Sequence, residues 1–202
     1  GTAADRKRLY INGERVTSWG TQANPSSGYE SHWNSTQPHR IGADANPFYF
    51  NGYVAEFHSV DGQALAPTDF GEYNVEGVWM PKKVSGLTYG VNGFYLDFSD
   101  PNNIGADRSG RNNNFTATGF ELSNPSSTSY DWMADSPTKN YATLNPLDSV
   151  PTLVNGNLGV SAQAGLSLGT ISVNQATYAE FQFPAASGYN ANVGFGSGDE
   201  QQ

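Results

Sequence analysis

The sequence predicts an all-β protein, and three observations lead to that class. Apolar and polar residues alternate over several short segments, Asn-Gly and Asp-Gly dipeptides punctuate the chain, and charged residues are few. Charged residues make up 14% of the 202 residues and aromatic residues 13%. This combination is typical of an all-β surface protein. It argues against disorder, because a disordered chain has few aromatic residues and a high charge.

Composition also narrows the classes of partner. The formal net charge is −9, whereas binding to nucleic acid through phosphates requires clusters of Lys and Arg, so we expect no nucleic-acid partner. The chain contains no cysteine, which excludes disulfides and thiolate metal sites. Because the sequence shows neither a long apolar run nor a basic-plus-apolar leader, we expect no membrane insertion and no signal peptide.

The segment 48–65, FYFNGYVAEFHSVDGQAL, predicts the strand around which the rest is organised. Residues 53–60 alternate with a period of two, which indicates one long, half-buried strand. Asn51-Gly52 before it suits a type I′ turn, in which both central residues need a positive φ. Glu56 and His58 are expected on the solvent face of this strand rather than as an acid–base pair.

Other segments predict shorter β elements. Residues 5–17 indicate a hairpin with its turn at Asn12-Gly13, and residues 153–160 indicate a second one. Phe94, Leu96 and Phe98 fall on one face of a strand that we expect to pack on a core. Residues 176–183 alternate cleanly and predict another strand.

Several motifs in order give the chain a family resemblance. NGYVAEFHSVDGQAL is followed by PTDFG at 67–71, WMPK at 79–82, GVNGFYL at 90–96, and further matches between Trp132 and Pro146. This series resembles a laminin-G or concanavalin-like lectin domain, in the version found in tail-fibre-like and other structural proteins of marine bacteriophages. The resemblance covers residues 6–160.

The resemblance implies three parts. Residues 1–98 are the C-terminal part of a jelly-roll-type antiparallel β-sandwich, residues 99–150 are an irregular Asn-, Ser- and Pro-rich connector, and residues 151–202 are a second β unit that resembles the start of a SPRY-like sandwich. The family has further strands before residue 6, so we expect incomplete sheets that other chains or a longer polypeptide would complete. A homo-oligomer, such as the trimer common among fibre proteins, is one way to do so.

The polar loop at 18–40 carries aromatic residues that are candidates for glycan binding: Trp19, Tyr29, His32 and Trp33. Pyranose rings stack their C–H faces on aromatic rings, so exposed aromatics in a polar loop suit a sugar. The alternative is that Trp19 and Trp33 cap the core. Exposure of both on a shared face would favour sugar binding over a purely architectural role.

A calcium site is the one cofactor that the sequence suggests. Asn34, Asp44 and Asn46 are candidate ligands, because Ca²⁺ takes several oxygen ligands and laminin-G-like domains often bind it at the rim of the sandwich. The alternative is that these residues form Asx turns without a metal.

The function expected from this resemblance is a non-catalytic structural protein of the virion, on the exterior of the phage particle and thus extracellular. Concanavalin-like glycosidases place two carboxylates at alternate positions of a strand, whereas here Glu56 is followed by His58. Its partners would be other virion proteins and a host surface polysaccharide. Two alternatives remain: an architectural decoration or spacer protein that binds no sugar, and an accessory domain of a carbohydrate-active enzyme.

Overall fold

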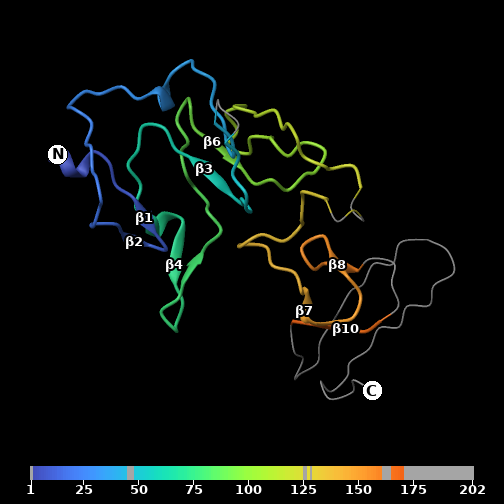
Figure 1. The fold of residues 1–202 in the computed structure, drawn as a ribbon. Helices are drawn as coiled ribbons and strands as arrows, with labels where there is room; N and C mark the ends of the chain where they lie inside the picture. Colours follow the sequence, from blue (N-terminus) through green and yellow to red (C-terminus); the bar gives the residue numbers. More distant parts are fainter. Residues whose placement is uncertain (1, 45–47, 125–126, 128, 161–164, 171–202) are drawn as a thin grey trace. The chain divides into compact units, whose positions relative to one another are not determined.

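A computed structural model describes residues 2–44, 48–124, 127, 129–160 and 165–170. These residues form short strands and three single-turn 3₁₀ helices, with no α-helix among them (Figure 1). The all-β class is therefore confirmed, and the jelly-roll sandwich stays a prediction. The described part of the chain has no helix long and apolar enough to span a bilayer.

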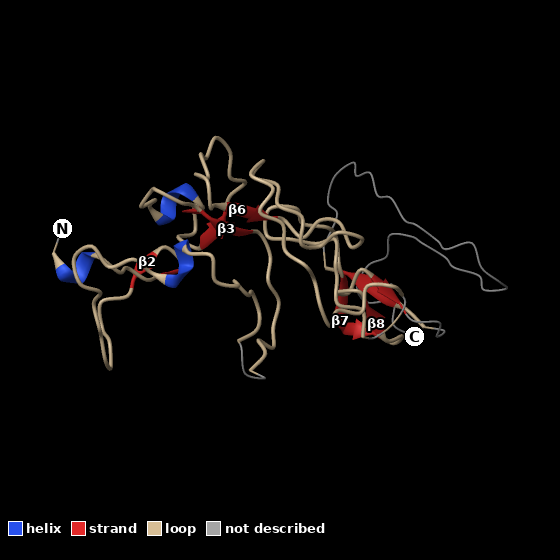
Figure 2. Cartoon of the chain, turned by 90° about the horizontal axis from the view of Figure 1, so that it is seen from above, coloured by secondary structure: helices blue, strands red, loops and turns tan. Residues whose placement is uncertain are grey.

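Every strand pair is antiparallel and every sheet in the described residues has two strands. The pairs are β1 (Tyr10–Ile11) with β2 (Glu14–Arg15), β3 (Phe57–Ser59) with β6 (Phe94–Leu96), β4 (Gly71–Tyr73) with β5 (Trp79–Pro81), β7 (Leu144–Ser149) with β10 (Ser167–Gly169), and β8 (Leu153–Val154) with β9 (Gly159–Val160). The 3₁₀ helices are η1 (Ala3–Asp5), η2 (His32–Asn34) and η3 (Pro67–Asp69). Loops make up most of the remaining described chain (Figure 2).

The chain divides into two compact units. Unit 1 comprises residues 1–122 and 134–140, and unit 2 comprises residues 123–133 and 141–202. Strands β1 to β6 belong to unit 1, and β7 to β10 belong to unit 2.

The predicted N-terminal hairpin is confirmed as β1–β2. Its turn residues Asn12 and Gly13 have φ values of 49° and 82°, which are those of a type I′ turn. The hairpin packs on the β4–β5 hairpin through Trp79, whose ring lies against the backbone of Gly13. Tyr73 adds a hydrogen bond, because its hydroxyl donates to Glu14 Oε1 at 2.6 Å.

The core of unit 1 lies at the β3–β6 pair, which Figure 1 shows side by side. Phe94 and Leu96 are 5% and 1% exposed, so the prediction that this strand packs on a core is confirmed. The Phe94 ring stacks on Phe57 at 5.8 Å and contacts Phe115 at 4.8 Å between centroids. Phe98 does not continue the strand, because its φ of 53° turns the chain away.

The long strand predicted over residues 53–60 is wrong in its length. Only Phe57–Ser59 pair, and they pair with β6. The residues before them have no strand partner in the described part of the chain, and Glu56 interrupts the run with a φ of 52°. The predicted turn at Asn51-Gly52 is also wrong, because neither residue has the positive φ that a type I′ turn needs.

Unit 2 contains the other predicted hairpin, β8–β9, which is confirmed. Its connection uses Asn155, Gly156 and Asn157, all with φ between 54° and 64°, a conformation that Gly and Asn adopt at low cost. Met133 packs against Gly156, where an added Cβ would lie 2.8 Å from Met133 Cε. The strand predicted at 176–183 lies outside the described residues.

Candidate functional site

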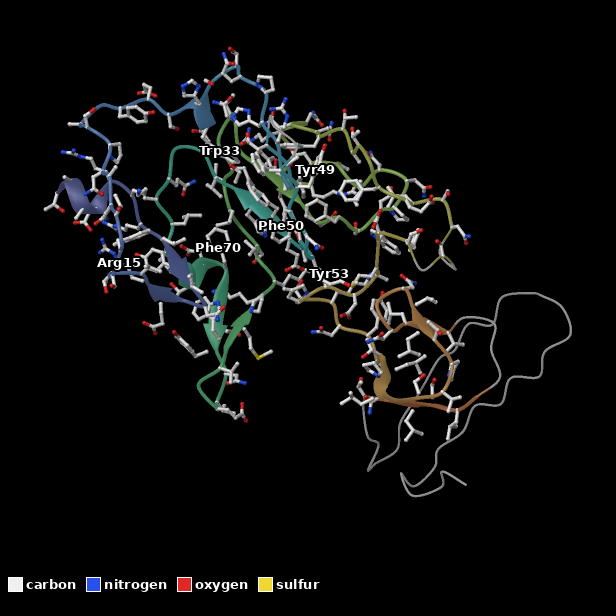
Figure 3. The ribbon with its side chains drawn as sticks, in the orientation of Figure 1. Arg15, Trp33, Tyr49, Phe50, Tyr53 and Phe70 are labelled. Atoms are coloured by element: carbon white, nitrogen blue, oxygen red, sulfur yellow. The ribbon has the colours of Figure 1, made fainter. Side chains whose placement is uncertain are left out.

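Trp33, at the centre of η2, is the best positioned of the predicted glycan-binding residues (Figure 3). Its indole N–H donates to Ser59 Oγ of β3 at 3.2 Å, and its ring lies 6.2 Å from that of Phe94 between centroids. His39 approaches the indole edge-on at 5.2 Å. The side chain is nevertheless 49% exposed. Trp33 therefore contacts the core on one side and faces solvent on the rest, and glycan binding by this ring stays a prediction.

The other three aromatic candidates of the loop differ in exposure. Tyr29 and His32 are exposed. Trp19 is half-buried, and the ammonium of Lys7 lies 5.6 Å from the centroid of its ring. Lys7 therefore occupies one approach to the Trp19 ring, which makes Trp33 the stronger candidate for stacking on a ligand.

A second group of aromatic residues was not predicted as a site. We call it the aromatic strip: Phe48, Tyr49, Phe50 and Tyr53, with exposed fractions of 72%, 76%, 60% and 87%. Figure 3 shows Tyr49, Phe50 and Tyr53 along the segment that leads to β3. The sequence pattern does not predict the strip: alternation begins only at Tyr53, indicates a half-buried strand over residues 53–60, and does not show whether a neighbouring strand is present.

Phe50 lies against its own backbone. A Cβ added at Gly52 would be 2.7 Å from Phe50 Cζ, so the ring covers the glycine closely. Gly52 thus leaves room for the Phe50 ring, which stays 60% exposed.

His58 is turned toward its neighbours rather than toward solvent, which corrects the sequence prediction. Its ring stacks on Tyr95 at 4.1 Å between centroids with an angle of 6° between the planes. Its Nδ1 shares a hydrogen bond of 2.7 Å with the Tyr89 hydroxyl. Burial lowers the pKa of His58, against the opposing effect of Glu56, and burial raises the pKa of Tyr89 to about 12.

Glu56 is also turned inward, contrary to the sequence prediction. It precedes β3 with a φ of 52°, and its Oε1 accepts hydrogen bonds from the hydroxyls of Ser136 and Thr138. Those two residues belong to a tight turn in which Ser136 and Lys139 exchange backbone hydrogen bonds. The Glu56 carboxylate therefore holds segment 134–140 against the rest of unit 1.

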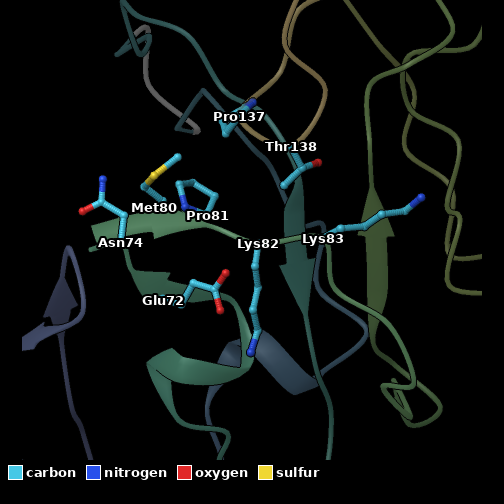
Figure 4. A pocket seen from close by; sticks show the side chains of 8 residues that line it. All are labelled: Glu72, Asn74, Met80, Pro81, Lys82, Lys83, Pro137 and Thr138. Carbon is cyan, nitrogen blue, oxygen red and sulfur yellow. The ribbon is translucent and has the colours of Figure 1, made fainter. Parts of the chain in front are cut away.

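The same turn borders a pocket of about 320 Å³ on the β4–β5 hairpin (Figure 4). Its lining combines one carboxylate, one amide, one hydroxyl, two lysines and three apolar side chains: Glu72, Asn74, Met80, Pro81, Lys82, Lys83, Pro137 and Thr138. The ammonium of Lys82 donates to the Thr68 carbonyl, so this lysine is already engaged within the protein.

Of the three candidate calcium ligands, only Asp44 has a described side chain, so the calcium site stays a prediction. Asn46 lies outside the described residues, and Asn34 is described only by its backbone in η2. Asp44 is exposed, and its N–H donates to the Phe48 carbonyl at 3.1 Å. No group of three or more His, Asp and Glu side chains suited to a metal ion occurs within the described ranges.

The exposed aromatic rings of unit 1 are better suited to contact a ligand or partner than to catalyse a reaction. The rings of Trp33 and the aromatic strip are exposed, whereas His58 and Glu56, the groups nearest to acid–base chemistry, are stacked or hydrogen-bonded within unit 1. Comparison of the chain with protein-family models, with curated proteins and with solved structures finds no match.

Proposed function

We propose that this chain is a non-catalytic structural protein of a bacteriophage particle, an exterior fibre or adhesion component whose completed jelly-roll sandwich binds host surface glycans. The observation that carries the proposal is the position of Trp33, which is held by Ser59 and Phe94 and is still 49% exposed. A ring that is already held in place loses little side-chain entropy when a ligand stacks on it.

The surroundings of Trp33 favour a sugar as its ligand. Tyr29 and His32 are exposed in the same loop, and they offer hydroxyl and imidazole groups for hydrogen bonds. A pyranose presents C–H groups to an aromatic face and hydroxyls to such polar neighbours.

The state of Glu56 and His58 supports a non-catalytic role. A glycosidase requires a proton donor and a second carboxylate on opposite sides of the scissile bond. Here the Glu56 carboxylate accepts two hydroxyl hydrogen bonds, and burial lowers the pKa of His58, whose ring is stacked on Tyr95.

Glycan binding is tested with an array of bacterial surface polysaccharides and with tryptophan fluorescence titrations of the positive spots. Replacing Trp33 by Leu, which keeps an apolar contact with Phe94, should weaken binding about threefold to tenfold, because an aromatic contact contributes about 0.5–1.5 kcal/mol. Val75→Ala is the matched control, since Val75 is 97% exposed at the β4–β5 turn.

The outcomes separate the alternatives. Immunogold labelling of the particle exterior together with glycan binding would support the proposal. Labelling without binding to any polysaccharide would favour an architectural spacer, and binding without labelling would favour an accessory domain of a carbohydrate-active enzyme.

A further inference from the structure

The segment Asn51–Ala55 leaves its backbone hydrogen-bonding groups open. Within the described part of the chain, none of its N–H or C=O groups makes a hydrogen bond, and every residue in it is exposed. The segment continues directly toward β3, where Phe57–Ser59 pair with β6. It bends at Gly52, and Glu56, with a φ of 52°, separates it from β3. Its open N–H and C=O groups are those to which another strand adds.

The aromatic strip makes the same segment apolar. Four aromatic side chains within residues 48–53 are each at least 60% exposed. The buried hydrophobic residues within the described part of unit 1, by contrast, are only Tyr89, Phe94, Leu96 and Ala106. Exposed aromatic side chains that gather within six residues mark a candidate interaction surface.

We propose that residues 48–55 pair as an antiparallel strand with the same residues of a second copy of this chain, which forms a two-fold dimer. The open N–H and C=O groups favour a polypeptide as the partner, because a strand satisfies both kinds of group at regular intervals. A glycan would cover the rings and leave the backbone to water.

Self-complementarity favours a second copy over an unrelated chain. The sequence between Asp44 and Glu56 contains no charged residue, so antiparallel pairing sets no like charges opposite one another. A two-fold axis between antiparallel strands sets one residue opposite its own copy, and pairing centred on Asn51 sets Tyr49 opposite Tyr53, an aromatic pair of the kind that stabilises antiparallel strands. A two-fold contact also covers both aromatic strips at once.

Sedimentation velocity of the full chain over about 1–200 μM tests the proposal. The expected species has twice the chain mass of 21.7 kDa. Val54→Pro removes an N–H that makes no hydrogen bond among the described residues, so it should weaken dimerisation at least tenfold without unfolding unit 1. Tyr53→Lys should do the same, because a charged side chain replaces the aromatic partner of Tyr49, whereas Val75→Lys should leave the dimer intact.

A second measurement keeps the test independent of folding. Amide hydrogen exchange of residues 51–55 should be slow at high chain concentration and fast after dilution. A monomer throughout, a trimer, or a dimer that withstands both strip variants would overturn the proposal. Because Trp33 is unchanged in these variants, loss of dimerisation and loss of glycan binding are read separately.

Discussion

At the scale of single residues, Asp107 shows how one carboxylate organises a loop that has little regular structure. Its Oδ1 accepts hydrogen bonds from the N–H groups of Tyr95 and Ser109, at 2.9 and 2.8 Å. Its Oδ2 accepts from the Ser109 hydroxyl at 2.8 Å and from the Asn113 N–H at 2.9 Å. The loop after Asp107 is thereby held against β6.

We expect Asp107→Asn to destabilise unit 1 by about 1–3 kcal/mol at pH 7, because the amide replaces one acceptor oxygen by a donor and loses the charge that strengthens these hydrogen bonds. Urea unfolding followed by tryptophan fluorescence measures the change. Asp100→Asn is the control, since the Asp100 side chain accepts one hydrogen bond, from the Asn102 N–H at 2.9 Å. Equal losses in the two variants would contradict this role of Asp107.

The same residue predicts a pH dependence. Burial raises the pKa of Asp107, but the hydrogen bonds from Tyr95, Ser109 and Asn113 outweigh burial and leave the pKa below its ordinary value of 3.8. A carboxyl with a lowered pKa in the folded state stabilises the fold above the unfolded pKa, and this stabilisation is lost as the pH falls through the folded pKa. The Asp107→Asn variant should therefore lose less stability than the parent chain below about pH 4.

At the scale of elements, Trp79 joins two hairpins. Cβ atoms added at Gly13 and Gly71 would lie 2.4 and 2.5 Å from atoms of its ring. The ring is thus packed closely against the β1–β2 turn and the start of β4. The Tyr73 ring meets Trp79 edge-on at 5.0 Å between centroids, which adds a second aromatic contact within the β4–β5 hairpin.

Gly71→Ala should destabilise this packing by about 1–3 kcal/mol, because the added methyl overpacks a site bounded by the Trp79 ring and the Met80 carbonyl. Thermal unfolding and the near-ultraviolet circular dichroism of Trp79 are the measurements. Gly20→Ala is matched in chemistry, and its Cβ would meet no atom within 4 Å, so a change of less than about 0.5 kcal/mol is expected. Similar effects at both glycines would show that Trp79 does not confine Gly71.

At the scale of the whole molecule, net charge opposes the proposed pairing of copies. Each chain carries a formal charge of −9, so two copies repel one another at low ionic strength, although the paired segments themselves are uncharged. Raising NaCl from about 0.05 to 0.5 M should strengthen dimerisation several-fold, because added salt shortens the Debye length from more than 10 Å to less than 5 Å. Sedimentation at both salt concentrations measures it, and weaker association in high salt would point instead to ion pairs at the interface.

The sequence by itself determined the all-β class and the two hairpins at Asn12-Gly13 and Asn155–Asn157. These features depend on local chemistry: positive φ is accessible to Gly and Asn, and alternation places Phe94 and Leu96 on one face of a strand. Contacts within a few residues are sufficient for such features, so a sequence pattern expresses them directly.

The length of the paired strand and the long-range contacts of the candidate site were decided only by the tertiary structure. Whether residues 53–60 form one paired strand depends on a neighbour, and β6 pairs only with Phe57–Ser59. Trp33 meets Ser59 across 26 positions of the chain, and Glu56 meets Thr138 across 82. The periodicity of a sequence does not identify such partners, because it indicates which face of a segment is apolar and not which other segment covers that face.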